Sequence, residues 1–132
     1  MSTQGEIKTT IAQGLLIFNL LKSELLELNP ESQVYFAGSM LRFLNTPDRI
    51  INDLDVIVVN ELGRLDKPIQ DYFRNNEKFK VLRLGRVIGS ILFNGIQIDI
   101  TACKELYLES TRLKVTGDSV FNLVLRSYAK LS

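Results

Sequence analysis

The chain has 132 residues, of which 45% are hydrophobic and 23% charged, and this size and composition indicate one globular domain rather than a disordered chain. One cysteine excludes an intrachain disulfide, and the absence of histidine excludes both a Cys/His zinc site and any hydrolase mechanism with a histidine base. The formal net charge of +1 gives no overall basic field that would mark a nucleic-acid-binding protein.

The first helix is indicated by apolar residues that recur at helical spacing from Glu6 to Leu28, where Asn29-Pro30 should end it. No basic segment with an apolar stretch opens the chain, so we expect no secretion signal. The most apolar window, Ile11 to Leu21, is too short to span a membrane. We therefore expect a cytoplasmic protein (or one of the host cytoplasm, if viral) with no membrane partner.

The middle of the chain alternates strand and loop signals. Val34 to Ala37 is short and β-prone and ends at Gly38-Ser39, while Met40 to Leu44 could be a helical turn or continued chain. A loop follows at Asn45 to Asp48. The patterns then predict, in order, a buried strand, a helix, two strands and a strand after the hairpin turn Asn94-Gly95: 53–59, 60–76, 81–84, 89–93 and 96–101.

The C-terminal part should hold a polar linker and a last helix, Ser119 to Leu131, opened at Thr116. Helices and strands thus alternate without an internal repeat. The order predicts a mixed α/β (α+β) domain, with a central mixed sheet flanked by helices.

Three aspartates stand out by position. Asp53 and Asp55 flank one apolar residue at the start of a strand, so their carboxylates share a face. Asp99 lies on an alternating strand, on the face opposite its isoleucines. If the two strands are neighbours, the three carboxylates converge; otherwise they are ordinary solvated acids.

Converging carboxylates repel one another unless a cation lies among them. Mg²⁺, or Mn²⁺, takes oxygen ligands and leaves positions for water and phosphate. Two such ions are the arrangement that supports phosphoryl transfer. The sequence therefore predicts a metal site made by Asp53, Asp55 and Asp99.

Gly38-Ser39 directly after a strand could cradle phosphate, because a glycine lets backbone N–H groups approach phosphate oxygens and a serine adds a donor. Arg42 could reach the same phosphates. A plain turn and a surface arginine are the alternative interpretations.

Basic residues gather in two segments, either as an anion-binding face or as ordinary charged surface. The first holds five between Phe73 and Ser90, and the second holds four after Thr111. The candidates for nucleic-acid contact are Arg83, Arg86 and Arg126.

Gly38-Ser39 followed by Asp53-Leu54-Asp55 resembles the glycine-serine and Asp-x-Asp signature of the nucleotidyltransferase superfamily, and Asp99 resembles its third carboxylate. The segment from Thr116 to Asn122 resembles the Thr-Gly-Ser-x-x-Phe-Asn segment of family X (polymerase beta-like) DNA polymerases. The resemblance covers about residues 6–132, as one palm domain (1–132) in which residues 116–132 resemble the first thumb helix.

The resemblance implies a nucleotidyltransferase that adds nucleotides from a nucleoside triphosphate to a DNA 3′-hydroxyl and releases pyrophosphate. Asp53 and Asp55 would bind both metal ions and Asp99 the catalytic one. Residues implied at the nucleotide are Gly38, Ser39 and Arg42 on the phosphates, Gly117 under the sugar and Asn122 at the base edge, with Arg126 toward the template.

This sequence departs from the family at several places, among them a longer loop between Ser39 and Asp53. Lys114 and Val115 replace an aromatic pair that sets sugar selectivity, and Gln97 replaces a basic residue before Asp99. The sequence ends at Ser132, before most of a thumb, so a protein partner could replace the missing part. Two alternatives stay open: a template-independent transferase acting on RNA, protein or a small molecule, as in toxin–antitoxin pairs, and a non-catalytic nucleic-acid-binding subunit.

Overall fold

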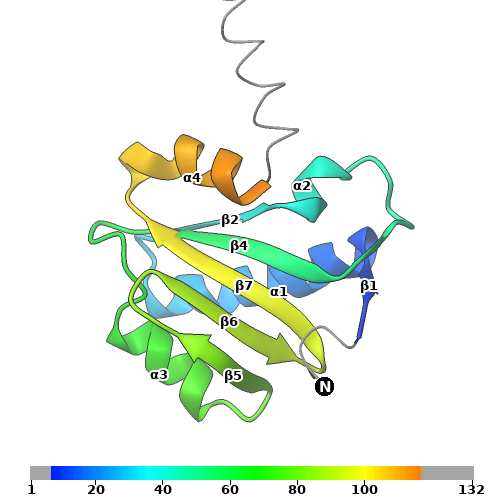
Figure 1. Ribbon diagram of the computed structural model, residues 1–132. Helices are drawn as coiled ribbons and strands as arrows, with labels where there is room; N and C mark the ends of the chain where they lie inside the picture. Colours follow the sequence, from blue (N-terminus) through cyan, green and yellow to red (C-terminus); the bar gives the residue numbers. More distant parts are fainter. Residues whose placement is uncertain (1–6, 117–132) are drawn as a thin grey trace, which may run out of the picture.

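A five-stranded mixed sheet runs through the molecule in the order β2-β4-β7-β6-β5 (Figure 1). The computed structural model describes residues 7–116. β4 and β7 are parallel neighbours, and the other three pairs are antiparallel. The predicted mixed α/β class is confirmed. The strands are β2 (Gln33–Ala37), β4 (Asp53–Val59), β5 (Phe79–Leu84), β6 (Ile88–Phe93) and β7 (Ile96–Cys103).

Helices cover both faces of this sheet (Figure 1). α1 (Ile11–Leu28) and α3 (Lys67–Asn75) pack on one face and enclose the larger apolar core. α4 (Leu108–Thr116), entered through the short 3₁₀ helix η1 (Glu105–Tyr107), packs on the other face over a smaller cluster. Within residues 7–116, no helix is long and apolar enough to cross a membrane.

The side chains of β4 point alternately to the two faces of the sheet, and this alternation separates the apolar residues from the aspartates. Leu54, Val56 and Val58 point into the larger core, whereas Ile57 and Val59 lie against the α4 side. Because successive strand residues point to opposite faces, the two aspartates that precede Val56 share the α4 side. The larger core thus takes only apolar side chains from this strand.

α1 begins at Ile11 and not at Glu6, so the predicted start was wrong. Thr10 caps the helix, because its hydroxyl oxygen accepts a hydrogen bond from the Gln13 N–H at 3.2 Å. Just before the helix, β1 (Thr9–Thr10) pairs with β3 (Ile50–Ile51). Pairing with a distant segment, which local periodicity does not show, holds these residues extended.

α3 is shorter than the predicted helix of residues 60–76. It begins at Lys67, where the Asp66 side chain accepts from the Ile69 N–H and Pro68 stands in the first turn. Proline suits that position because its missing N–H would have no helical partner there. The preceding residues form a loop in which the Asn60 side-chain oxygen accepts from the backbone N–H of Gly63 and Arg64.

The segment predicted as a polar linker is instead helical, because η1 and α4 occupy residues 105–116. Leu108 and Val115 pack against the sheet, which gives this polar helix its apolar stripe. Thr116 is therefore the last described residue of a helix, and it does not open one as predicted. The helix predicted for Ser119 to Leu131 lies outside the described residues.

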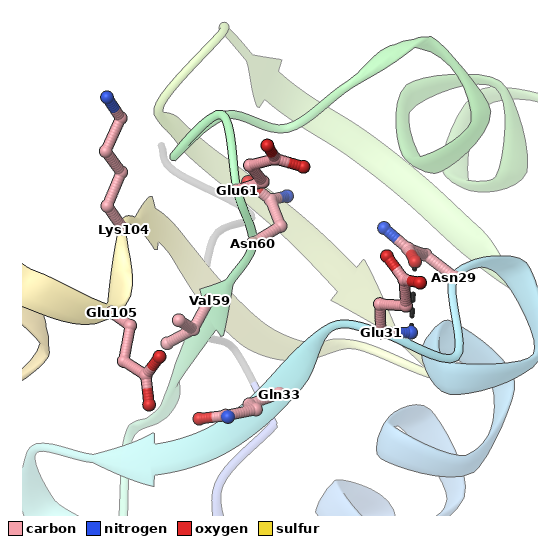
Figure 2. Close-up of a pocket in the computed structure, with 8 residues that line it drawn as sticks. All are labelled: Asn29, Glu31, Gln33, Val59, Asn60, Glu61, Lys104 and Glu105. Atoms are coloured by element: carbon pink, nitrogen blue, oxygen red, sulfur yellow. Dashed lines mark hydrogen bonds between the residues drawn. The ribbon is translucent and has the colours of Figure 1, made fainter.

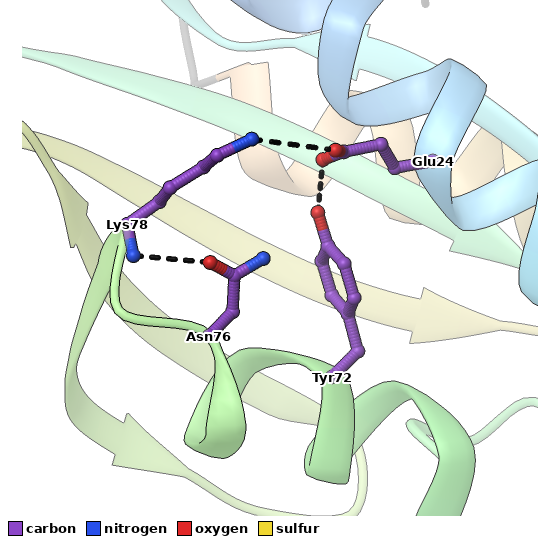
Figure 3. Close-up of polar contacts among 4 residues, drawn as sticks. All are labelled: Glu24, Tyr72, Asn76 and Lys78. Atoms are coloured by element: carbon purple, nitrogen blue, oxygen red, sulfur yellow. Dashed lines mark hydrogen bonds and ion pairs between the residues drawn. The ribbon is translucent and has the colours of Figure 1, made fainter.

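A polar cluster joins α1 to α3 on the side away from α4 (Figure 3). The Tyr72 hydroxyl donates a hydrogen bond to Glu24, which also pairs with the Lys78 ammonium at 3.9 Å. Burial and this carboxylate raise the pKa of Tyr72, so the phenol stays protonated. The ring itself contacts Phe73 and Phe79 at centroid distances of 5.1 and 5.6 Å. This cluster therefore fixes α3 against α1.

Candidate functional site

The three aspartates meet on the face of the sheet that α4 partly covers. In the parallel pair β4–β7, Asp55 lies opposite Asp99, and Asp53 lies opposite Gln97. Parallel neighbours are about 4.8 Å apart, and paired residues share a face. The expectation that these strands are neighbours is confirmed, so the sheet brings the three carboxylates together.

The carboxylates are close enough to perturb one another. Burial raises the pKa of Asp55 to about 7, with further contributions from the charges of Asp53 and Asp99. Burial is also the largest cause that raises the pKa of Asp53. The charge of Asp99 and a hydrogen bond with Asp99 raise it further. Among the described residues the one ion pair lies elsewhere, between Lys78 and Glu24. The acidic cluster therefore carries negative charge without a cationic side chain paired to it.

Two neutral donors fix the third carboxylate. The Ser90 hydroxyl donates to Asp99 Oδ1 at 2.7 Å, and the Gln97 side-chain amide donates to the same oxygen at 2.9 Å. Ser90 lies directly opposite Asp99 in the antiparallel β6–β7 pair. The other oxygen of Asp99 is therefore the one left for a ligand.

The turn after β2 lies against the same cluster. Gly38 has φ +65°, and a Cβ placed on it would lie 1.9 Å from Asp55 Oδ2. Both the backbone conformation and the close approach require glycine. Ser39 follows as the first residue of α2 (Ser39–Arg42). The predicted phosphate turn and the predicted acids are thus in contact.

Thr116 links this turn to α4. Its hydroxyl oxygen accepts from the Gly38 N–H at 3.2 Å, and its carbonyl accepts from Arg42 Nη2. Arg42 is exposed apart from this contact and one with the Phe43 ring, whose centroid is 5.8 Å from its guanidinium carbon. The first residue of the Thr-Gly segment therefore touches the Gly-Ser turn, although 78 positions separate Gly38 from Thr116.

The donor chemistry of the three acids suits a hard divalent cation, which would offset the burial and the repulsion that raise the pKa of Asp55. Within residues 7–116, no three His, Cys, Asp or Glu side chains are already arranged as a set of metal ligands. Binding would thus require small side-chain rotations that draw the carboxylates onto one ion. The Ser90 and Gln97 hydrogen bonds limit this movement for Asp99.

Of the three residues predicted for nucleic-acid contact, Arg83 and Arg86 lie in the described region. Arg83 is exposed on β5 and lines an open hollow of about 540 Å³ next to Asp99, together with Ser90 and Gln97. Arg86 is exposed between β5 and β6, and its carbonyl accepts from the Leu65 N–H. Gly117, Asn122 and Arg126 lie outside the described residues.

A second hollow of about 340 Å³ lies at the far end of β4 (Figure 2). Its lining includes three glutamates, Glu31, Glu61 and Glu105, against one lysine, Lys104. This acidic lining would repel a triphosphate, whereas the turn at Gly38 offers Ser39 and Arg42. The two hollows are therefore chemically distinct, and of these two the one next to Asp99 is better suited to a phosphorylated substrate.

Sequence reasoning missed the roles of Ser90 and Thr116. A signal for Ser90 was present, because the two-residue turn at Asn94-Gly95 fixes the hairpin register. Counting back from that turn pairs Ser90 with Asp99. No comparable signal predicts the contact of Thr116, because it depends on how α4 packs over the sheet.

Comparison with known proteins supports the fold. No protein-family model and no curated protein sequence matches the chain. Polymerase beta of Leishmania infantum in a ternary gap complex is similar in structure, with a TM-score of 0.72 and 16% identity over 93% of this chain and 47% of that one. The same polymerase in a ternary P/T complex gives a TM-score of 0.69 and 17% identity over 92% and 53%. The chain spans about half the length of those polymerase chains, and it has a polymerase beta-like fold.

Proposed function

We propose that this protein is a metal-dependent nucleotidyltransferase that transfers a nucleoside monophosphate from a nucleoside triphosphate to a hydroxyl group. One observation carries the proposal: Asp53, Asp55 and Asp99 lie together beside the Gly38 turn, on a polymerase beta-like fold. A structural acidic cluster would gain nothing from a turn packed against it that only glycine can form. A site for triphosphate and cation needs both.

The proposed reaction is a displacement at the α-phosphorus of the nucleoside triphosphate. The acceptor hydroxyl oxygen forms a bond to the α-phosphorus, and the bond from that phosphorus to the bridging oxygen of the leaving pyrophosphate breaks. The hydroxyl proton goes to the Asp99 carboxylate or to water.

The other residues bind and orient. Ser39 would donate its hydroxyl to the β- and γ-phosphates, and Arg42 would add a charge-assisted hydrogen bond. Asp53 and Asp55, with Asp99, would hold two Mg²⁺ ions, with Mn²⁺ as an alternative. Bound ions would supply positive charge that neutralises the triphosphate and the pyrophosphate as it leaves.

The acceptor that we propose is a DNA 3′-end. Arg83 beside the hollow next to Asp99 provides a cation for a phosphate backbone. The structural neighbours are polymerase beta in gap and P/T complexes. Gly117 and Asn122 are proposed for the sugar and base of the nucleotide, and Arg86 and Arg126 for additional backbone contacts. A partner protein would supply further contacts with the DNA.

Primer extension tests the proposal. Labelled gapped, recessed and single-stranded DNA would be incubated with Mg²⁺ or Mn²⁺ and with each dNTP or NTP, and both primer length and pyrophosphate would be measured. We expect extension with stoichiometric pyrophosphate release. Asp99→Asn should abolish both at unchanged folding, whereas Arg42→Ala should mainly raise the KM for the triphosphate.

A parallel reaction with α-labelled nucleotides separates the alternatives. Label on RNA, on a protein or on a small molecule, with none on DNA, would replace the DNA polymerase by a template-independent transferase. Nucleic-acid binding without any transfer would favour a non-catalytic subunit. Full activity in Asp99→Asn would refute the assignment of the site.

A further inference from the structure

β2 is an edge strand with one unpaired side. It pairs with β4 on its inner side, and in the part of the chain that the structure describes no strand lies beyond it in the sheet order. In an antiparallel pair about half of the backbone N–H and C=O groups point away from the partner. Within residues 7–116, no backbone hydrogen bond outside the β4 ladder involves Val34, Tyr35 or Phe36. Such an edge can accept an added strand.

A hollow of about 260 Å³ follows this edge. It is lined by those three consecutive β2 residues together with side chains from both layers of helices: Phe18, Lys22, Leu41 and Arg112. Phe36 faces α1, where its ring meets the Phe18 ring edge-on at 5.3 Å, whereas Tyr35 lies on the α4 side. The hollow therefore wraps around the edge of the sheet and touches both of its faces.

One cation stands on each side of this hollow. The Lys22 ammonium lies 6.0 Å from the centre of the Phe18 ring on the α1 side. The Arg112 guanidinium lies 5.0 Å from the centre of the Tyr35 ring on the α4 side, and its buried Nε has no hydrogen-bond partner among residues 7–116. Within the described residues neither cation forms an ion pair. Two unneutralised positive charges thus flank an apolar, aromatic edge.

These charges select the occupant. A second copy of the chain, docked edge to edge, would bring like charges together. The chain's own residues 117–132 carry two basic residues and one acidic residue, so their charge does not complement the hollow. Adjacent residues of an added strand point to opposite faces of a sheet. Two neighbouring acidic residues on a foreign strand would therefore reach Lys22 on one side and Arg112 on the other.

We propose that β2 is a docking edge for an extended acidic peptide of a partner protein, which binds by strand addition. Its main chain would pair with the free edge of β2, and two adjacent carboxylates would pair with Lys22 and Arg112. Peptide recognition of this kind takes affinity from backbone hydrogen bonds and specificity from alternate side chains. The proposal is independent of nucleotidyl transfer, because none of these residues belongs to the aspartate cluster.

Fluorescence anisotropy tests the proposal with the full chain. The probe is a labelled peptide of alternating valine and threonine with two adjacent glutamates at its centre. Lys22→Gln and Arg112→Gln should each weaken binding about tenfold, the loss expected for one charge-assisted hydrogen bond. Lys80→Gln is the matched control, because Lys80 is an exposed lysine of β5, the opposite edge strand. It should leave binding unchanged.

Two modified peptides separate strand addition from simple charge attraction. N-methylation of the alternate backbone amides that face β2 should abolish binding, whereas N-methylation of the other alternate set should not. Replacement of both glutamates by glutamine should weaken binding. Equal binding of all peptides, an equal loss in Lys80→Gln, or no binding at all would overturn the proposal. Displacement of the peptide by single-stranded DNA would assign the edge to nucleic acid instead, and self-association that depends on Lys22 would assign it to a second copy.

Discussion

Replacing Asp55 by asparagine should stabilise the metal-free protein while it abolishes transfer. Asparagine has nearly the same shape, so it keeps the contact with Gly38 but removes the charge. The pKa of Asp55 is about 7 instead of 3.8, and a difference of one pKa unit corresponds to about 1.4 kcal/mol. Ionised Asp55 therefore costs the folded state up to about 4 kcal/mol. Because burial and two neighbouring charges contribute to this cost together, we expect a measured gain of about 2–4 kcal/mol.

The sign of the pH dependence follows from proton binding. Between about pH 4 and 7 the folded protein binds more protons at Asp55 than the unfolded chain does, so the free energy of unfolding falls as the pH rises through this window. Below that window the carboxyl is protonated in both states and the cost disappears. The advantage of Asp55→Asn should thus grow from pH 4 to pH 7 and stay constant above it.

Urea unfolding at several pH values, in the presence of a chelator, measures this advantage. Asp48→Asn, in an exposed loop, is the control and should show no such trend. Adding Mg²⁺ or Mn²⁺ should then stabilise the wild type more than Asp55→Asn, because the ion binds the folded carboxylates. A variant that is no more stable than the wild type at pH 8 would refute the argument that an ionised, buried Asp55 destabilises the folded state.

Three other variants have defined expectations. Ser90→Ala removes a hydrogen-bond donor from Asp99, so kcat should fall about tenfold while KM changes little. Calorimetry should show altered metal binding in this variant, and the control Ser90→Thr should retain function. Gly38→Ala places a Cβ on Asp55 at an unfavourable φ, and urea unfolding should show a loss of about 1–3 kcal/mol. Tyr72→Phe removes the hydrogen bond to α1 and should cost about 1 kcal/mol by the same measurement, without affecting transfer.

The placement of the aspartates could be predicted because each lies on a strand with a strong pattern. Alternation assigns Asp53 and Asp55 to one face of β4, and the isoleucines of β7 assign Asp99 to the face opposite theirs. Only the pairing of β4 with β7 in the sheet had to be assumed. The resemblance of the Gly38-Ser39 turn to a nucleotidyltransferase signature made that assumption reasonable.

The features that could not be predicted depend on contacts between distant segments. β1 and β3 have two residues each, too few to show a period, and they exist because they pair with each other. α4 looks like a polar linker because few of its side chains are apolar, and its packing on the sheet through Leu108 and Val115 decides that it is a helix. The Ser90 contact with Asp99 follows from hairpin register, which a search for motifs does not use.

The position of Thr116 ties two helices into one mechanical unit. The same residue holds the backbone of Gly38 through its hydroxyl and the side chain of Arg42 through its carbonyl. Sliding α4 along its axis by even one residue, about 1.5 Å, would strain both links together. A displacement of α2 would strain the same two links, so the Gly38 turn and Thr116 hold one another in place across 78 positions of the chain.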